Sequence, residues 1–388
     1  MASPATAPAS QSSVRLIAAA CLAILVYGII AAMLGTIMTS LQFTPDEKGY
    51  IALAQAFGLI LASLAAGPLI DNKGKKVGLV LSLFTIALAL SLLPIGMRLS
   101  SYPMIMLNLF LLGFGGGVLV TAASALVSDV GGEKRASMMN LLNVNFGLGG
   151  LLTPLVAALL AGDTIRLVYL AAILSALVLL LNATTAMPPP TGETNFKLSE
   201  AGPLLSRPAL WLLSFFMFLY VSCEVGVWNW LVQHLVARGI GRDTALSILS
   251  LGFALGMLIG RLVVSRILIK VSARTVTLGS AILMAVTTFA MLNTSDPTMA
   301  WIAVYCAGLA MAPVFPTTLA IVGDAFPVAT GTAMGIVITC GWIGLAVSSR
   351  IIGSIAGGEP KRLKKALLIL PAMALLMIAV NLALHLVI

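Results

Sequence analysis

One acidic side chain stands in the middle of a long apolar run and is the first candidate for chemistry. Glu224 lies near the centre of the run from Ala209 to Arg238. An ionisable group at bilayer depth is costly unless it faces a cavity or a partner, so it marks a solute or ion pathway. Tyr220 and Trp228 lie four residues to either side and therefore on the same helical face. Aromatic rings and amides suit a sugar or another small polar solute, and the same stretch adds Asn229, Trp230 and Gln233.

Further amides and one indole are secondary candidates. Asn143 and Asn145 lie in the apolar run 134–161, and Asn108 lies in 101–129. An amide at this depth needs a hydrogen-bond partner, which either a polar solute or a neighbouring helix would supply. Trp342 either forms part of the cavity wall or packs between helices. The sequence leaves these alternatives open.

The composition requires a membrane protein. Sixty per cent of the 388 residues are hydrophobic and 9% are charged, and the mean hydropathy is +1.09. A soluble domain of this length would not carry such a composition. The net charge of +9 comes from basic residues in short loops, where they orient the chain, so no nucleic-acid partner is expected. We expect no metal and no cofactor, because the four cysteines lie in apolar runs without metal-ligand spacing: Cys21, Cys223, Cys306 and Cys340.

The sequence predicts an all-α polytopic fold with twelve transmembrane helices in two six-helix bundles. A span needs about 20 apolar residues. Cutting the chain at glycine, proline and charge clusters gives spans at 14–40, 47–71, 76–96, 101–129, 134–161, 165–186, 209–238, 243–268, 274–292, 297–325, 328–356 and 362–388. The first is interpreted as a span and not as a removable signal. The predicted units are a cytoplasmic tail at 1–13, one bundle at 14–186, a proline-rich cytoplasmic linker at 187–208 and a second bundle at 209–388.

Lysines and arginines near the span ends predict the orientation. Most of them, including Lys73 and its neighbours in the second-to-third loop, lie on the side that carries both termini, which is therefore predicted to be cytoplasmic. The basic block from Lys361 to Lys365 falls on the other side and conflicts with the rule. The short loops favour a bacterial inner-membrane protein.

An internal repeat supports two similar halves. Residues 113–129 align without gaps to residues 308–324 and share the leading glycine, one alanine and the closing aspartate. These segments lie in the fourth and tenth spans, six spans apart, as two fused halves require.

The loop between the second and third spans reads GPLIDNKGKK, from Gly67 to Lys76. Gly67 would allow close helix approach, and Gly74 would turn a loop that leaves no room for a side chain. Asp71 can accept hydrogen bonds from the positive N-terminal end of a facing helix. The two basic residues that follow are Lys75 and Lys76.

This loop resembles the signature of the major facilitator superfamily at every defined position. Further stretches resemble the superfamily's fucose/glucose/galactose permease group, at 140–154, 223–232, 255–266 and 308–317. The resemblance implies alternating access between two bundles and a single-chain transport unit. It places Asp71 against the eleventh span and the basic residue against Asp129, as a cytoplasmic clasp. It also suggests that Arg261, within the group's Gly-Arg pattern, pairs with Asp324 in a second clasp.

The chain departs from the proton-coupled members of this group. Those permeases carry a carboxylate in the first span and another in the fourth, just before a Thr-Ala-Ala-Asn-like run. Here the first span has no acid, and Val120 precedes the run Thr121–Ser124. Glu224 is then the only carboxylate left at the membrane centre to carry a proton. The alternatives are that it binds solute or has a structural hydrogen bond.

These observations predict a secondary or facilitative transporter for a small polar solute, with a sugar favoured. An organic anion is the alternative if Arg350, near the outer end of the eleventh span, faces the cavity. Drug or lipid efflux is a further alternative, although the fifth span lacks the Gly-Pro-x-x-Gly-Gly element of that branch around Pro154. No nucleophile, base or metal constellation indicates an enzyme. The expected partners are the solute, the lipid bilayer and, under the coupling hypothesis, protons.

Overall fold

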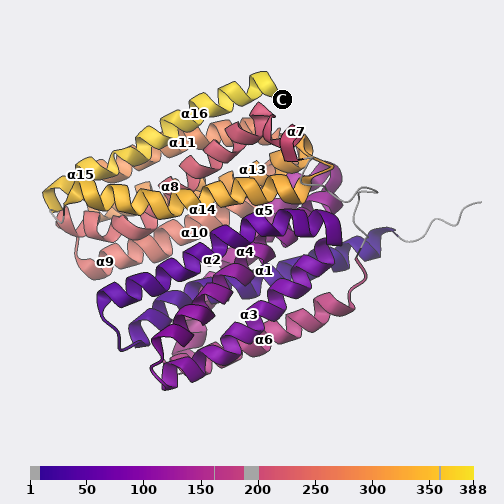
Figure 1. Cartoon of the computed structure of the whole chain (residues 1–388). Helices are drawn as coiled ribbons and strands as arrows, with labels where there is room; N and C mark the ends of the chain where they lie inside the picture. The colour runs from indigo at the N-terminus through magenta and orange to yellow at the C-terminus, as the bar shows by residue number, and fades with distance from the viewer. Residues whose placement is uncertain (1–8, 161, 188–200, 358–359) are drawn as a thin grey trace, which may run out of the picture.

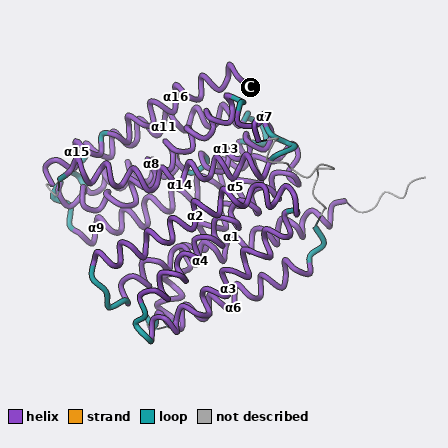
Figure 2. The backbone as a smooth tube through the Cα atoms, in the orientation of Figure 1, coloured by secondary structure: helices purple, strands orange, loops and turns teal. Residues whose placement is uncertain are grey.

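The computed structural model describes residues 9–160, 162–187, 201–357 and 360–388, and this part of the chain consists of helices joined by short loops, with no strand (Figures 1 and 2). The first half contains α1 (Ala9–Ser40), α2 (Pro45–Lys73), α3 (Lys75–Arg98), α4 (Tyr102–Gly131), η1 (Gly132–Lys134), α5 (Arg135–Leu159) and α6 (Thr164–Thr184). The second half contains α8 (Pro208–Ala237), α9 (Arg242–Ser247), η3 (Ile248–Phe253), α10 (Ala254–Ile267), α11 (Ala273–Asn293), α12 (Pro297–Met311), α13 (Val314–Ala325), α14 (Thr330–Ala356), α15 (Pro360–Leu367) and α16 (Ile369–Val387).

The twelve predicted spans are present in the described residues. Eleven helical stretches are long and apolar enough to cross a membrane, and one of them, 102–159, contains both α4 and α5. α1 starts at Ala9, inside the tail predicted for 1–13. Most of the predicted linker, 187–208, lies outside the described residues, and its last part forms the short helix α7 (Ala201–Leu205).

Three of the spans are interrupted. The eighth begins as α9, passes through the π-helical turn η3 and continues as α10. The tenth breaks between α12 and α13 at Pro313, which lacks a backbone N–H for the helical ladder. The twelfth breaks at Leu368, three residues before Pro371. π-helical turns and breaks occur in membrane helices where neighbouring helices or a cavity take up the freed backbone groups.

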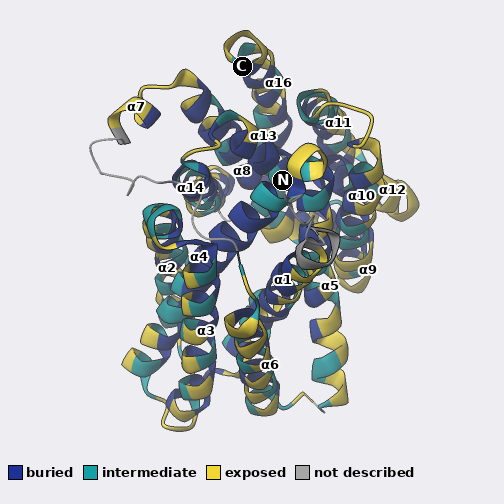
Figure 3. Cartoon of the chain, turned by 90° about the vertical axis from the view of Figure 1, so that its right-hand side faces the viewer, coloured by how far each residue is buried: buried dark blue, intermediate teal, exposed yellow. Residues whose placement is uncertain are grey.

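The start of α1 and the C-terminal end of α16 lie at one end of the molecule, on the right of Figure 1 and facing the viewer in Figure 3. We call this the termini end and the opposite one the far end. Large apolar side chains are exposed around the sides, as lipid contact requires. Examples are Phe84 and Leu180 in the first half and Leu283 in the second.

The two halves are packed in the same way around matching glycines. In the first half, α2 packs on α4, and a Cβ added to Gly113 would lie 2.0 Å from the carbonyl oxygen of Gln55. In the second half, α10 packs on α12, and a Cβ added to Gly308 would lie 2.4 Å from the carbonyl oxygen of Phe253. These are the leading glycines of the sequence repeat, so the repeat reflects the same close helix contact in each half.

Two adjacent glycines in α5 give a matched test of this packing. A Cβ on Gly149 would lie 2.1 Å from the carbonyl oxygen of Leu25 in α1, whereas a Cβ on Gly150 would meet nothing within 4 Å. We expect Gly149→Ala to destabilise the protein by about 1–3 kcal/mol, because the backbone of α1 must shift. Gly150→Ala should not destabilise the protein, because alanine is the better helix former and the added Cβ meets no neighbour. Thermal unfolding of the two variants in detergent checks this, and equal melting temperatures would contradict it.

Candidate functional site

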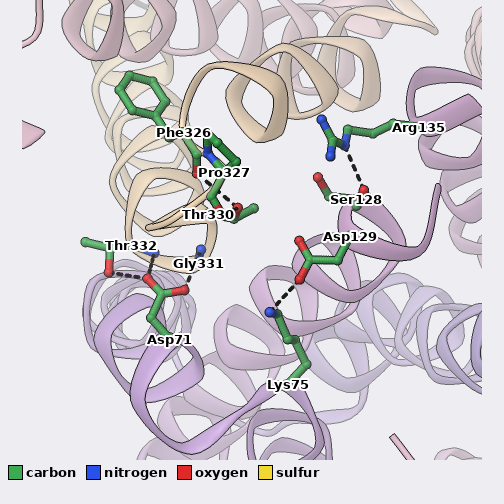
Figure 4. Close-up of polar contacts among 10 residues, drawn as sticks. All are labelled: Asp71, Lys75, Ser128, Asp129, Arg135, Phe326, Pro327, Thr330, Gly331 and Thr332. Atoms are coloured by element: carbon green, nitrogen blue, oxygen red, sulfur yellow. Dashed lines mark hydrogen bonds and ion pairs between the residues drawn. The ribbon is translucent and has the colours of Figure 1, made fainter. Parts of the chain in front are cut away.

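Asp71 joins the two halves at the termini end (Figure 4). Its Oδ1 accepts a hydrogen bond from Gly331 N at 2.9 Å, and its Oδ2 accepts bonds from Thr332 N at 2.8 Å and Thr332 Oγ1 at 2.7 Å. Gly331 and Thr332 lie in the first turn of α14, where the helix leaves N–H groups without internal partners and the dipole favours an anion. Close approach depends on Gly67, since a Cβ there would lie 2.5 Å from Thr332 Cα.

Two ion pairs flank this contact, and one of them corrects the sequence interpretation. Lys75 Nζ lies 2.5 Å from Asp129 Oδ2 within the first half. Asp324 pairs across the halves with Arg135, whose Nε also donates to Ser128 O at 2.7 Å. The predicted Arg261–Asp324 clasp is therefore wrong. Arg261 lies six residues before the end of α10, which places it about 9 Å along the helix from that end, towards the middle of the molecule.

Lys76 and Gly74 complete the loop. Gly74 has φ of +90°, which favours glycine and links α2 directly to α3. Lys76 is half-buried and forms no ion pair in the described part of the chain. Lys75 therefore contributes the cation of this loop.

Deeper polar contacts between the halves also lie towards the termini end. Asn140 Nδ2 donates to Thr317 Oγ1 at 3.0 Å, and Trp342 Nε1 donates to Ser63 Oγ at 3.1 Å. Trp342, the deepest of these, lies twelve residues into α14, or about 18 Å from its start. The contacts of Asp71, Arg135, Asn140, Arg261 and Trp342 that link the two halves lie within this depth. The halves are thus closed together at the termini end.

A cavity of about 460 Å³ lies between the halves and contains the central acid. The second half contributes the polar wall, from α8, η3 and α10: Glu224, Trp228, Ser250, Ala254, Met257, Leu258 and Arg261. The first half contributes the facing wall, from α1 and α5: Gly28, Ala31, Ala32, Phe146, Gly147, Gly150, Leu151 and Pro154. A larger depression of about 780 Å³ around Arg274 and Asp324 lies at the termini end.

Glu224 and Arg261 are the charged groups of this cavity. They form no ion pair within 4 Å of each other in the described structure. The hydroxyl of Tyr220, a fully buried residue, makes no hydrogen bond of regular geometry but interacts electrostatically with both groups. One acid and one base that share a cavity without direct pairing can hold a solute between them.

Arg261 also bridges the two halves. Its Nη1 donates to Asn143 O in α5 at 2.9 Å, and its Nε donates to Ala312 O at 3.3 Å, at the break between α12 and α13. The side chain is 6% exposed, so these backbone bonds compensate part of the cost of burying the guanidinium. The cavity cation therefore contacts both halves.

The predicted polar set on α8 is divided between two faces. Trp228 lines the cavity, is 39% exposed and packs edge to face against Phe253, with ring centroids 5.2 Å apart. Trp230 instead lies against Gly353 of α14. Asn229 and Gln233 are exposed and are not among the cavity residues. Of the residues predicted after Glu224 on α8, Trp228 alone lines the cavity, because a spacing of four residues returns to the same face of a helix.

The other amides make helix-internal bonds. The side chains of Asn108, Asn143 and Asn145 donate to the carbonyl oxygens four residues earlier, at 2.8, 3.0 and 2.9 Å. None of the three side chains lines the cavity, although the backbone of Asn143 holds Arg261. Trp342 links α14 to α2 and is likewise not a cavity residue.

The cavity arginine is not the one considered for an anionic solute. Arg350 is exposed and does not line the cavity, whereas Arg261 does. Arg261 could have been predicted as a cavity residue from the sequence. It is a charged residue inside an apolar span, which is the argument used for Glu224. The α5 part of the facing wall lies in the stretch 140–154, which resembles the permease group, but no sequence pattern assigned it to the cavity.

The basic block at the far end has a structural partner. Lys364 Nζ donates to Asn293 Oδ1 at 2.8 Å, and Arg238 donates to the carbonyl oxygens of Asn293 and Thr294 at 3.2 and 3.4 Å. Both cations lie at the C-terminal end of α11, where the helix dipole favours positive charge. Part of this block therefore stabilises a helix end.

Arg261→Lys is expected to weaken closure at the termini end while keeping the charge. An ammonium lacks the planar fork that reaches two carbonyl oxygens in different helices. Loss of one hydrogen bond from a charged group costs about 1.5–3 kcal/mol. Arg266→Lys, an exposed position on the same helix, is the matched control. Limited proteolysis of loops at the termini end should accelerate for the first variant only, and equal rates would contradict the bridge.

Comparison with known proteins identifies relatives of the whole fold. A family model described as Major Facilitator Superfamily matches residues 16–349 and 217–387. The crystal structure of the transporter FucP in the outward conformation superposes with a TM-score of 0.84 at 18% identity, covering 96% of this chain and 99% of that one. The proton:xylose symporter XylE superposes at 0.75 with 15% identity and 95% of each chain. The human organic anion transporter MFSD10 superposes at 0.77 with 16% identity, covering 97% of this chain and all of that one.

The curated relatives match over a smaller part of this chain and are longer than it. Bypass of stop codon protein 6 from Saccharomyces cerevisiae is 22% identical over 60% of this chain, and the match spans 52% of its own length. Human sodium-dependent glucose transporter 1 is 27% identical over 37% of this chain and 28% of its own length. The match thus spans about half or less of these relatives.

Proposed function

Because the chain belongs to the major facilitator superfamily, we propose that it moves a small polar solute, with a sugar favoured, by exposing the central cavity alternately to the two sides of the membrane. The observation that carries this proposal is the presence of Glu224, Arg261 and Trp228 in one cavity between the halves. Sugar hydroxyls can donate to a carboxylate and accept from a guanidinium, while the C–H face of the ring lies on an indole. The similarity of the fold to the fucose:proton symporter FucP and to the proton:xylose symporter XylE supports this class.

The contacts at the termini end would form the closed gate in this cycle. We propose that the contacts of Asp71 with α14 and of Arg135 with Asp324 hold that end shut and separate when the cavity opens there. The Lys75–Asp129 pair would order the loop within the first half. Gly67 and Gly74 would permit the close contact, and Arg261 would add a deeper bridge. The bundles 14–186 and 209–388 would be the moving units, joined by the linker 187–208.

The membrane placement follows from the charge distribution. We propose that the termini end is cytoplasmic, that the host membrane is a bacterial inner membrane and that one chain is the transport unit. The loop basic residues near Lys73 favour this orientation. The cavity then faces outward in the state described above.

An organic anion is the second candidate. It is favoured by Arg261, a permanent cation in the cavity, and by the structural similarity to the human organic anion transporter MFSD10. Against it, Glu224 shares the cavity and would repel a carboxylate. For this reason a neutral polyhydroxylated solute remains the preferred proposal.

A competition experiment separates the classes. Purified protein in proteoliposomes is loaded with a panel of radiolabelled monosaccharides, short carboxylates or lipophilic cations, and exchange is measured against unlabelled members of each class. We expect exchange within the neutral sugars and no displacement by the other two classes. Exchange confined to carboxylates would establish the anion alternative, and exchange confined to lipophilic cations would establish efflux.

A further inference from the structure

The two walls of the cavity differ in chemistry, and we infer from this that the solute carries an apolar substituent of its own, as a short alkyl or aryl glycoside does. This inference rests on the proposed sugar-like function and names a narrower class for the same site. The charged and hydroxyl-bearing lining residues, Glu224, Ser250 and Arg261, all come from the second half. The first half contributes glycine, alanine, leucine, proline and one phenylalanine.

Polar side chains of the first half near this wall are directed elsewhere. Thr153 Oγ1 donates to Ile29 O at 3.1 Å and to Gly149 O at 3.0 Å. Asn143 and Asn145 donate to carbonyl oxygens of their own helix. Tyr27 is 4% exposed and packs against Gly116 of α4. None of these side chains lines the cavity, so the facing wall presents apolar side chains and glycine backbone to a solute.

An apolar wall favours apolar groups of a solute over its hydroxyl groups. A hydroxyl pressed against this wall would lose its water without gaining a hydrogen bond, which is unfavourable. A methylene in the same place would leave water for an apolar surface, which strengthens binding about fourfold for each CH₂. The expected solute thus presents its hydroxyls to α8 and α10 and an apolar substituent to α1 and α5.

The cavity has room for such a substituent. Its volume of about 460 Å³ lies within the range of roughly 300–1,000 Å³ of sites that take ligands of drug size. Leu151 and Phe146 provide the largest apolar side chains of the facing wall. A substituent directed at them would lie on the opposite side of the cavity from Glu224.

The test is a binding series with the full-length protein in lipid nanodiscs. Isothermal titration compares each monosaccharide that exchanges in the competition experiment with its methyl, propyl and phenyl glycosides. We expect the affinity to rise about fourfold per methylene from methyl to propyl. Leu151→Ala should reduce the gain from the substituent, measured within the variant as the ratio of glycoside affinity to parent-sugar affinity. Leu152→Ala, at an exposed neighbouring position outside the cavity, should behave as wild type.

The outcomes distinguish the two proposals. If the parent sugar binds while affinity stays flat or falls along the glycoside series, the apolar-substituent inference is overturned and the sugar proposal stands. If neither sugars nor glycosides bind, the sugar proposal fails and the inference fails with it. A gain that persists unchanged in Leu151→Ala would also overturn the assignment of the substituent to this wall.

Discussion

Replacing Asp71 with asparagine is expected to separate the two halves at the termini end. Asp71 accepts three hydrogen bonds from the first turn of α14. An asparagine keeps one acceptor oxygen and turns an NH₂ group towards donors, so about two charge-assisted bonds are lost. At about 1.5–3 kcal/mol each, the closed state should lose roughly 3–6 kcal/mol relative to the open one. That is a change of at least 100-fold in the ratio of the two states.

Double electron–electron resonance would measure this separation as the distance between spin labels at Lys73 in the first half and Val328 in the second. Both positions are exposed at the termini end. The matched control is Asp46→Asn, an exposed acid at the other end of α2. We expect a longer label distance for the Asp71 variant and the wild-type distance for the control. An unchanged distribution for Asp71→Asn would mean that these bonds do not hold the end closed.

Glu224→Gln is expected to reduce solute affinity by about 10- to 150-fold. The change keeps the shape of the side chain and removes its charge, so a hydrogen bond to a charged acceptor, worth about 1.5–3 kcal/mol, is weakened or lost. It also leaves Arg261 as the uncompensated charge of the cavity, which is costly in a buried site. Isothermal titration with the solute that exchanges in proteoliposomes measures the loss. Binding at wild-type affinity would assign Glu224 a structural role.

Proton coupling through Glu224 is a separate proposal with a distinct signature. If Glu224 carries the proton, an imposed pH gradient should drive accumulation by the wild type, and Glu224→Gln should lose this drive while still exchanging solute. If Glu224 binds solute, exchange itself should fall in the variant. Uptake by the wild type that ignores the gradient would indicate a facilitator or another coupling ion, as the absence of an acid in the first span suggests.

The fold was largely predictable because each of its determinants is local in sequence. Apolar runs of about 20 residues set the spans, and the loop from Gly67 to Lys76 set the contact with the eleventh span. The leading glycines of the repeat, Gly113 and Gly308, predicted matching halves, and both make the same close contact in the structure. Interruptions such as the π-helical turn η3 were not predicted, since nothing in its residues marks it.

The site was predictable only in part, because it depends on which face each helix turns inward. Periodicity placed Trp228 beside Glu224, but it could not exclude Trp230, which points to α14. Arg261 was assigned to a clasp with Asp324 because both lie near helix ends in sequence. In the structure, Arg261 lies about 9 Å from the end of α10 and does not reach Asp324, which pairs with Arg135 instead. The apolar wall was not predicted, because glycine, alanine and leucine are common in membrane helices and do not show which face of α1 or α5 lines a cavity.

Solute uptake by three forms of the protein tests the central claim most directly, namely that the cavity around Glu224 is the transport site. Proteoliposomes containing wild type, Glu224→Gln or Glu133→Gln would be compared for uptake of the same labelled sugar. Glu133 is exposed in η1, away from the cavity. The account predicts that wild type and Glu133→Gln take up the sugar at equal initial rates and that Glu224→Gln is at least tenfold slower. Equal uptake by all three forms would contradict it.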